Sequence, residues 1–316
     1  MRLAALACAA WLAAGAAGLP NGVMAQPAQD EPPAGMKGPP PAQGQPMQGP
    51  GEVSDRDTLG FWQGSPNFAA AQKLGVRVVD MPAFRSMFAY WLPPGFEARQ
   101  PQRTIVAVHG TGGTVYAEIQ DEAAMAAKLG YAVIAVQARR PGDPSGRGPD
   151  SVASAGGGNN IPPRELYGLI HQSVQTLQSR KGLDLSRLAY VGFSAGGAAA
   201  AQIGYLDRRS PRPMFRLMVN HSGLSRSELG FMREVSSGRA TAQPFAGLAF
   251  ALWCGMRDEQ WGRQQCDDMK AMEALLAKLG AGPVRAVRDE AGSHMGYRRT
   301  PAYHEAFMRW FIELTP

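Results

Sequence analysis

Residues 188–201 read Leu-Ala-Tyr-Val-Gly-Phe-Ser-Ala-Gly-Gly-Ala-Ala-Ala-Ala, and this stretch decides the fold. Its apolar beginning, 188–191, predicts a strand, and its small residues, 197–201, predict the start of a helix. Between them lies Gly192-Phe193-Ser194-Ala195-Gly196. A serine on a sharp turn from strand to helix sits in a strained backbone with its hydroxyl exposed, and glycines are needed because a Cβ would clash there. Ser194 is therefore a candidate nucleophile. The alternative is a tight turn that only happens to contain serine.

A serine hydroxyl is a weak nucleophile at neutral pH and needs a base, which is in turn oriented by an acid. Of the five histidines, His294 fits the base, because it lies on a glycine-flanked loop after a predicted strand, 284–287, and before the last predicted helix. That position suits the chain order Ser…Asp…His. The other four are assigned to a helix (His171), the surface of the last helix (His304), a strand end (His221) and the loop after an earlier strand (His109).

The acid should follow a strand between the serine and the histidine. Residues 247–253 form an apolar run long enough for a buried strand, and Asp258 lies on the loop beyond it. There it would fix the tautomer of His294 and stabilise the imidazolium. The alternative is an aspartate that caps a turn or a helix N-terminus. The competing carboxylates are Asp267, Asp268 and Asp289, and the adjacent Glu259 is a possible substitute.

Backbone donors for an oxyanion are predicted after the strand 104–108. The segment His109-Gly110-Thr111-Gly112-Gly113-Thr114 follows it, and glycines there let N–H groups point at a developing negative charge. We expect one donor from Thr111 or Gly112 and the other from the amide of Ala195, the residue after the nucleophile. His109 would organise the loop by hydrogen bonding. A phosphate-binding loop is the alternative, but neither G-K-[ST] nor G-x-G-x-x-G is present.

These motifs, His109-Gly110-Thr111-Gly112, Gly192-x-Ser194-x-Gly196, Asp258 and His294, resemble the α/β-hydrolase superfamily in this order. Ser194-Ala195-Gly196-Gly197, Pro93-Pro94-Gly95-Phe96 and Cys254-Gly255-x-x-Asp258 resemble the secreted feruloyl esterases and polyhydroxybutyrate-depolymerase-like esterases. Prolyl-oligopeptidase-type and dienelactone hydrolases are similar in the same places. The resemblance covers about residues 76–316. It implies an α/β-hydrolase fold, although one fold hosts many chemistries.

The expected function is hydrolysis of a carboxylic ester, small or polymeric, by a serine esterase. Ser194 would attack the ester carbonyl, His294 would move the proton, and Asp258 would orient His294. Three alternatives stay open: a serine peptidase on the same fold, a depolymerase that acts on solid polyester, and a non-catalytic binding protein. Which acyl and alcohol groups are accepted is also open.

The order of predicted elements gives the architecture. Strands alternate with helices from residue 76 onward, which predicts a mostly parallel sheet with helices on both faces. Two segments, 137–161 and 222–244, are candidates to cover the site, but both are short for a large helical lid, so we expect an open or loop-bordered cleft with no large lid domain. Four aromatic residues beside catalytic positions are either a wall for the substrate or ordinary core, namely Phe193, Trp253, Trp261 and Tyr297.

The first residues indicate export. Residues 1–25 carry one charge, Arg2, then an alanine-rich apolar stretch that ends in Val23-Met24-Ala25, a pattern typical of a cleaved signal peptide. The stretch is short for a membrane span, so we expect no stable anchor. Residues 26–51, rich in Pro, Gln and Gly, predict a disordered tether. A catalytic domain, 52–316, of about 265 residues remains.

The cysteines and the net charge bear on the expected disulfide, cofactor and partner. Cleavage would leave two cysteines, Cys254 and Cys266, which in an exported protein favours a disulfide around Asp258; two buried thiols are the alternative. Cys and His are not grouped at metal-site spacing, so we expect neither a metal nor another cofactor. The net charge of +6 is dispersed, with arginines in pairs such as Arg298-Arg299, so we expect no nucleic-acid partner. An alternative is that Arg298-Arg299 faces an anionic substrate, and the oligomeric state stays open.

Overall fold

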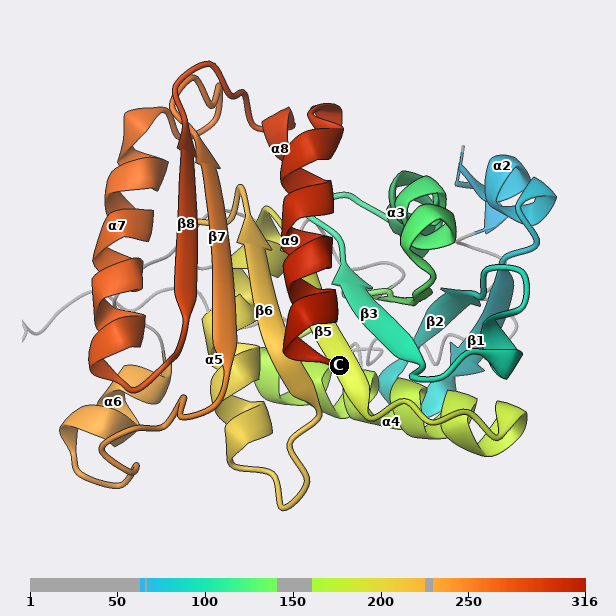
Figure 1. Ribbon diagram of the computed structural model, residues 1–316, viewed down its shortest axis with the longest axis horizontal. Coiled ribbons are helices and arrows are strands. Elements are labelled where there is room, and N and C mark those ends of the chain that lie inside the picture. The colour runs from blue at the N-terminus through green and yellow to red at the C-terminus, as the bar shows by residue number, and fades with distance from the viewer. Residues whose placement is uncertain (1–62, 66, 141–160, 225–229) are drawn as a thin grey trace, which may run out of the picture. The chain divides into compact units, whose positions relative to one another are not determined.

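The computed structural model describes residues 63–65, 67–140, 161–224 and 230–316 (Figure 1). The predicted signal peptide, 1–25, and tether, 26–51, lie outside the described residues. Residues 141–160 of the first predicted border segment, 137–161, and residues 225–229 of the second, 222–244, lie outside them as well. The elements below all belong to the predicted catalytic domain.

One eight-stranded sheet forms the centre, in the order β1-β2-β4-β3-β5-β6-β7-β8. The first two strands pair antiparallel with each other, and β2 pairs antiparallel with β4; every other pair is parallel. The strands are β1 (Arg77–Met81), β2 (Ser86–Trp91), β3 (Arg103–Val108), β4 (Ala132–Val136), β5 (Arg187–Phe193), β6 (Phe215–His221), β7 (Ala249–Gly255) and β8 (Val284–Asp289).

Helices cover both faces of this sheet, because alternate residues of each strand point to opposite faces. In β5, Leu188 and Tyr190 join the core under α4, α5 and α7, whereas Ala189 and Val191 join the core under α3 and α9. Figure 1 shows α9 in front of the sheet and α5 behind it. The helices are α2 (Phe68–Lys73), α3 (Val115–Leu129), α4 (Pro163–Lys181), α5 (Ala195–Arg208), α6 (Gly230–Ser236), α7 (Arg263–Lys278), α8 (Gly296–Arg299) and α9 (Pro301–Leu314), with the 3₁₀ turns η1 (Pro82–Phe84) and η2 (Phe96–Ala98).

Local signals explain where the long helices begin and end. The side chain of Thr114 accepts the Ala117 amide and so starts α3 at Val115, and Gly130, at φ 79°, ends it. Helix α7 begins at Arg263, after Gly262. The first turn of α7 has no regularly spaced apolar residues. It is held against the rest of the protein by the buried side chains of Gln265 and Cys266.

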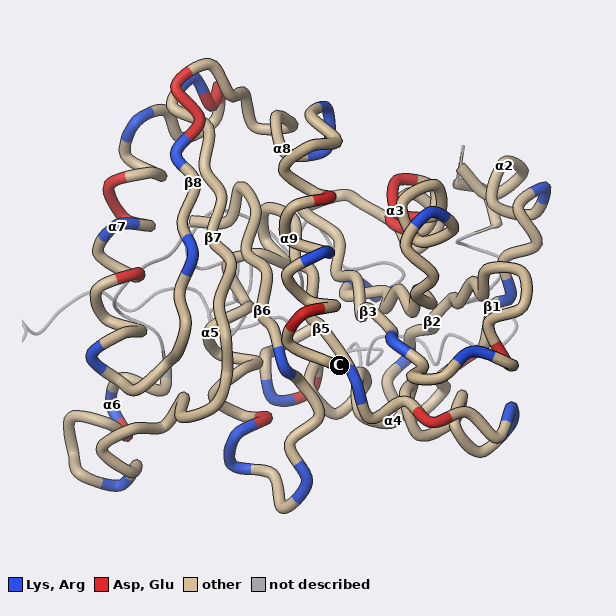
Figure 2. Tube along the Cα trace, in the orientation of Figure 1, with Lys and Arg blue, Asp and Glu red and all other residues tan. Residues whose placement is uncertain are grey.

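The α/β architecture is the one predicted from the sequence. Parallel strands β3, β5, β6, β7 and β8 all end at the same edge of the sheet, which brings the loops after them together. Basic and acidic residues are interspersed over the described elements (Figure 2). Among the described helices, none has an apolar stretch of the length that a bilayer requires.

Candidate active site

Ser194 stands on the predicted turn between β5 and α5. Its backbone has φ 51° and ψ −113°, a left-handed φ that is uncommon outside glycine. A Cβ on Gly192 would lie 2.4 Å from the carbonyl oxygen of Gly196, and a Cβ on Gly196 would lie 2.2 Å from that of Val108. Both positions therefore require glycine, and the packing of α5 against β3 and β5 keeps Ser194 in its strained conformation.

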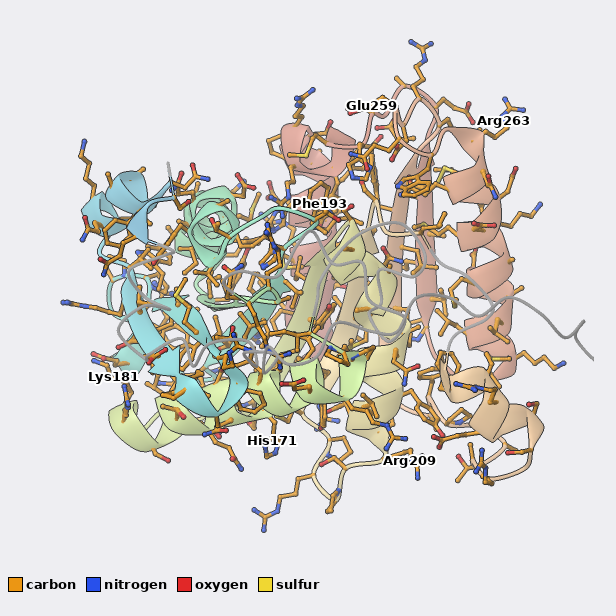
Figure 3. All side chains as sticks on the ribbon, turned by 180° about the vertical axis from the view of Figure 1, so that it is seen from behind. His171, Lys181, Phe193, Arg209, Glu259 and Arg263 are labelled. Atoms are coloured by element: carbon orange, nitrogen blue, oxygen red, sulfur yellow. A yellow bond between two sulfur atoms is a disulfide. The ribbon has the colours of Figure 1, made fainter. Side chains whose placement is uncertain are left out.

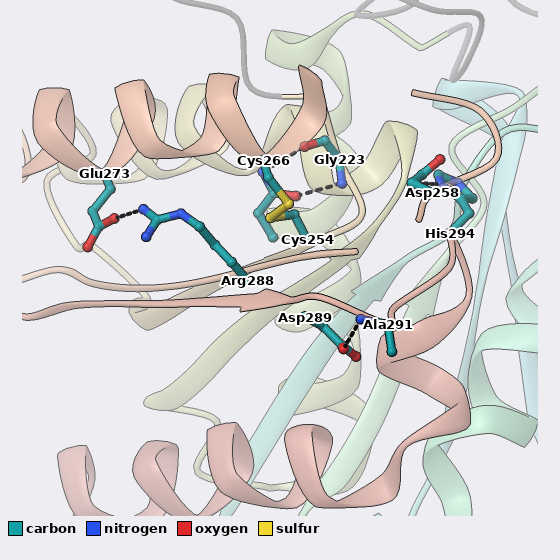
Figure 4. The surroundings of a disulfide bond; sticks show 10 residues. Gly223, Cys254, Asp258, Cys266, Glu273, Arg288, Asp289, Ala291 and His294 are labelled. Atoms are coloured by element: carbon teal, nitrogen blue, oxygen red, sulfur yellow. Dashed lines mark hydrogen bonds and ion pairs between the residues drawn. A yellow bond between two sulfur atoms is a disulfide. The ribbon is translucent and has the colours of Figure 1, made fainter. Parts of the chain in front are cut away.

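The structure brings Ser194, His294 and Asp258 together in one hydrogen-bonded chain. His294 Nδ1 lies 2.6 Å from Asp258 Oδ2 (Figure 4). His294 Nε2 lies 3.0 Å from Ser194 Oγ. Because the carboxylate only accepts, Nδ1 carries the proton and Nε2 is left to accept from the serine hydroxyl. His294 and Asp258 are each 4% exposed. This is the geometry that proton transfer from a serine to an imidazole requires.

The two oxygens of Asp258 have separate partners. While Oδ2 accepts from His294, Oδ1 accepts the amides of Gln260 at 2.8 Å and Trp261 at 3.0 Å. Cys254 at the end of β7 and Cys266 in α7 form a disulfide whose loop contains Asp258 (Figure 4). The loop that carries Asp258 is thus fixed at its base by the disulfide and at the carboxylate by two amides.

None of the competing carboxylates reaches the imidazole ring. Glu259 Oε2 accepts the main-chain amide of His294 at 3.0 Å, which lowers the pKa of Glu259. Asp289 accepts the amide of Ala291 in the turn before His294. Asp267 and Asp268 lie within α7.

The loop after β3 passes directly beside Ser194. A Cβ on Gly110 would lie 2.9 Å from the Ser194 Cβ. A turn closes from the Gly113 amide to the Gly110 carbonyl at 3.1 Å, with Thr111 and Gly112 exposed at its centre and Gly112 at φ 75°. Ala195 is the first residue of α5, where helix geometry leaves the amide without an intrahelical acceptor.

His109 organises this loop from inside the protein. It is fully buried, its Nδ1 donates to the Gly110 carbonyl at 2.7 Å, and its Nε2 accepts the amide of Ala138 at 3.0 Å. Sequence reasoning missed Gln137, which donates to His109 Nε2 at 2.9 Å and accepts the Val115 amide at 3.1 Å. Gln137 thereby joins the loop to the start of α3, and nothing in the sequence around it signals this.

Of the residues predicted as an aromatic wall, Phe193 and Trp261 are partly exposed and Tyr297 is not. The ring of Phe193 lies 5.1 Å from that of His294. Figure 3 shows Phe193 and Glu259 toward the same end of the sheet, with His171 at the other end. Tyr297 is 1% exposed and stacks on His221 at 4.3 Å, so its assignment to the substrate wall is wrong. Trp253, in β7, is likewise core.

Two further interpretations are also wrong, the surface position of His304 and the substrate-facing position of Arg298. His304 is buried, where it pairs with Glu122 at 2.9 Å and stacks on Tyr297, because α9 turns this residue toward α3. Arg298 does not face a substrate anion: its guanidinium lies over Phe193 and pairs with Glu118 at 2.5 Å and with Asp121. Both side chains join the C-terminal helices to α3. Among the described residues, no group of three or more His, Cys, Asp or Glu could hold a metal ion.

The buried histidines predict a loss of stability in acid. Burial, opposed by its hydrogen bond to Gly110 and reinforced by Arg139 and Arg298, lowers the pKa of His109 to about 4, and burial lowers the pKa of His221 well below its usual value. Between about 6.5 and 4 the unfolded chain therefore binds protons that the folded chain does not. As the pH is lowered from about 6.5 to 4, the free energy of unfolding should therefore decrease, on the order of 3 kcal/mol for His109 alone.

Urea denaturation of the parent and of His109→Asn at several pH values isolates this contribution. Burial raises the pKa of Glu118 and Asp121, which opposes the histidines, but these carboxyls are common to both proteins. The pH dependence of the variant should be shallower by up to about 1.4 kcal/mol per pH unit. Equal slopes for the two proteins would show that His109 is not held neutral by burial.

Comparison with known proteins identifies the fold. The structure resembles an S-formylglutathione hydrolase from Agrobacterium tumefaciens, with a TM-score of 0.55 and 15% identity over 76% of this chain and 95% of that one. A fungal esterase from Rhizomucor miehei gives 0.54 and 17% over 81% and 89%, and an acetyl xylan esterase from Aspergillus awamori gives 0.51 and 17% over 75% and 98%. No family model and no curated sequence matches the chain. The chain has the α/β-hydrolase fold.

Proposed function

We propose that this protein is a serine hydrolase that cleaves carboxylic esters. The observation that carries the proposal is the chain of hydrogen bonds from Ser194 through His294 to Asp258, with Ser194 on a strained turn beside a glycine loop. The similar folds of several esterases support it as an analogy, because the fold alone does not determine the chemistry.

The geometry accounts for each step of acyl transfer. His294 Nε2 takes the proton of Ser194 as Oγ bonds to the ester carbonyl carbon, and Asp258 stabilises the imidazolium. The amides of Ala195 and of Thr111 or Gly112 hold the oxyanion. The bond to the alcohol oxygen then breaks, and His294 returns its proton to that alcohol. Water attacks the acyl-enzyme with His294 again as the base, which releases the acid and restores the serine.

Hydrolysis of p-nitrophenyl esters of graded acyl length by residues 26–316 tests the proposal. We expect turnover, and the preferred chain length tests whether the partly exposed Phe193 and Trp261 contact the acyl group. Anilides of the same acids form the second arm. Turnover of anilides without esters would assign a peptidase instead, and a folded protein that turns over neither would remove the proposed activity.

We also propose that the protein acts outside the cytoplasm. The Cys254–Cys266 disulfide supports this, because structural disulfides persist in oxidising compartments. The apolar segment before Ala25 supports export through a cleaved signal peptide. Expression of the full chain in a bacterial host, followed by fractionation and N-terminal sequencing, should yield periplasmic or secreted protein that starts near Gln26. Cytoplasmic protein that retains Met1 would contradict export.

A further inference from the structure

The end of β6 contacts both the serine and the histidine of the site, although it supplies neither. The main-chain oxygen of His221 accepts the Ser194 amide at 3.0 Å. The hydroxyl of the next residue, Ser222, donates to the main-chain oxygen of His294 at 2.6 Å. Two consecutive residues therefore hold the backbones of Ser194 and His294, whose reacting atoms lie 3.0 Å apart.

Ser222 adopts an unfavourable backbone conformation to make this contact. Its φ is 58°, in the left-handed region that costs a non-glycine residue free energy, and it is fully buried. Its amide donates to the Trp253 carbonyl at 3.1 Å, which ties it to β7. A glycine would relieve the strain but would lack the hydroxyl, so the contact with the His294 carbonyl is what serine adds at this position.

The turn around Ser222 is fixed on its other side as well. Asn220 Oδ1 accepts the Gly223 amide at 3.0 Å, and a Cβ on Gly223 would lie 2.3 Å from the amide nitrogen of Ala198 in α5. The ring of His221 stacks between Phe193 at 5.2 Å and Tyr297 at 4.3 Å. The turn packs against the start of the helix that follows Ser194, so it cannot shift independently of the nucleophile.

The backbone of His294 is thus held at two points, and its ring at a third. Glu259 accepts its amide at the exposed side, Ser222 donates to its carbonyl at the buried side, and Asp258 accepts from Nδ1. Figure 4 shows the ring beside Asp258. Rotation of the His294 main chain about the contact with Asp258 would move Nε2 away from Ser194. Of the two main-chain contacts of His294, the one with Ser222 is buried and so is better protected from water.

From this arrangement we infer that Ser222 is a positioning residue that sets the distance between Ser194 Oγ and His294 Nε2. The inference rests on the proposed function. Misplacement of reacting groups by about 1 Å can cost on the order of 100-fold in rate. Loss of the hydroxyl should therefore lower kcat and leave KM nearly unchanged, because Ser222 is fully buried and does not reach substrate.

Three variants separate positioning from general damage. Ser222→Ala removes the hydroxyl, and Ser222→Gly removes the hydroxyl and the backbone strain together. The matched control is Ser173→Ala, because Ser173 is also fully buried and donates to a main-chain oxygen, that of Leu169 at 2.7 Å, but within α4. We expect kcat for a p-nitrophenyl ester to fall about 10- to 100-fold in both Ser222 variants, with KM within about twofold, and Ser173→Ala to keep the parent kcat.

A second measurement follows the histidine directly. The Nδ1 proton of His294, hydrogen-bonded to Asp258, should give a low-field proton NMR signal, which we expect to shift or broaden in the Ser222 variants and to persist in Ser173→Ala. A Ser222→Gly variant with the parent kcat would overturn the inference, as would unchanged kcat and NMR signal in both variants while the parent is active. A folded parent with no turnover and no serine labelling would instead overturn the proposed function, and the inference with it.

Discussion

The Ser194→Ala variant should lose at least about 10⁴-fold in kcat on p-nitrophenyl esters while it stays folded. The expected loss is large because the covalent step has no other nucleophile on the turn, and the remaining oxyanion donors alone give only residual catalysis. The fold should tolerate alanine, since Ser194 Oγ has His294 as its partner and makes no contact that holds β5 to α5. Initial rates and the thermal midpoint measure both effects.

Ser173→Ala serves as the control for removal of a serine hydroxyl, and it should keep the parent rate. His294→Ala should lose as much activity as Ser194→Ala, and the double variant should lose little more, because residues that act as a unit are not additive. Parent-like turnover in Ser194→Ala would remove Ser194 from the mechanism. If the Ser194→Ala variant does not fold, covalent labelling of the parent protein tests the role of Ser194 instead.

The second large effect is expected from Asp258→Asn, about 10³- to 10⁴-fold in kcat. Asparagine keeps Oδ1 for the amides of Gln260 and Trp261, so the loop should hold its shape. Its NH₂ group, however, would face His294 Nδ1 and favour the tautomer with the proton on Nε2. That nitrogen then cannot accept the proton of Ser194.

In the structure Glu259, the neighbouring carboxylate, is not placed to replace the acid in Asp258→Asn. From the sequence, Glu259 is a substitute acid that would soften the effect. In the fold its carboxylate accepts the His294 amide, and so it faces the backbone and not the ring. Asp289→Asn is the control, because Asp289 caps the turn before His294, and its kcat should stay within about threefold of the parent. A rate for Asp258→Asn close to that of the control would point to a different acid.

The sequence was informative where chemistry demands particular residues at fixed spacing. Gly192 and Gly196 are required because any Cβ would clash with a neighbouring backbone, so the turn can be recognised from its sequence motif. The acid and the base follow strands that have clear apolar runs, which is why Asp258 and His294 could be placed on the same edge as Ser194. The same runs predicted the mostly parallel sheet.

Residues whose role depends on packing between distant segments could not be read in this way. Gln137 and Ser222 act through side-chain contacts across 28 and 72 positions of the chain, with His109 and His294 respectively. His304 looked exposed because it lies off the apolar stripe of its helix, yet its partner is a buried glutamate, Glu122, on α3. Helical periodicity reports apolar faces and carries no information about a buried polar pair.

Covalent labelling of the protein with a fluorophosphonate, followed by mass spectrometry of its peptides, tests the central claim most directly. The account predicts one adduct per chain, on Ser194, formed by the parent and formed far more slowly by His294→Ala because the hydroxyl then lacks its base. An adduct on another residue, or a folded parent that does not react, would contradict the assignment of Ser194 as an activated nucleophile.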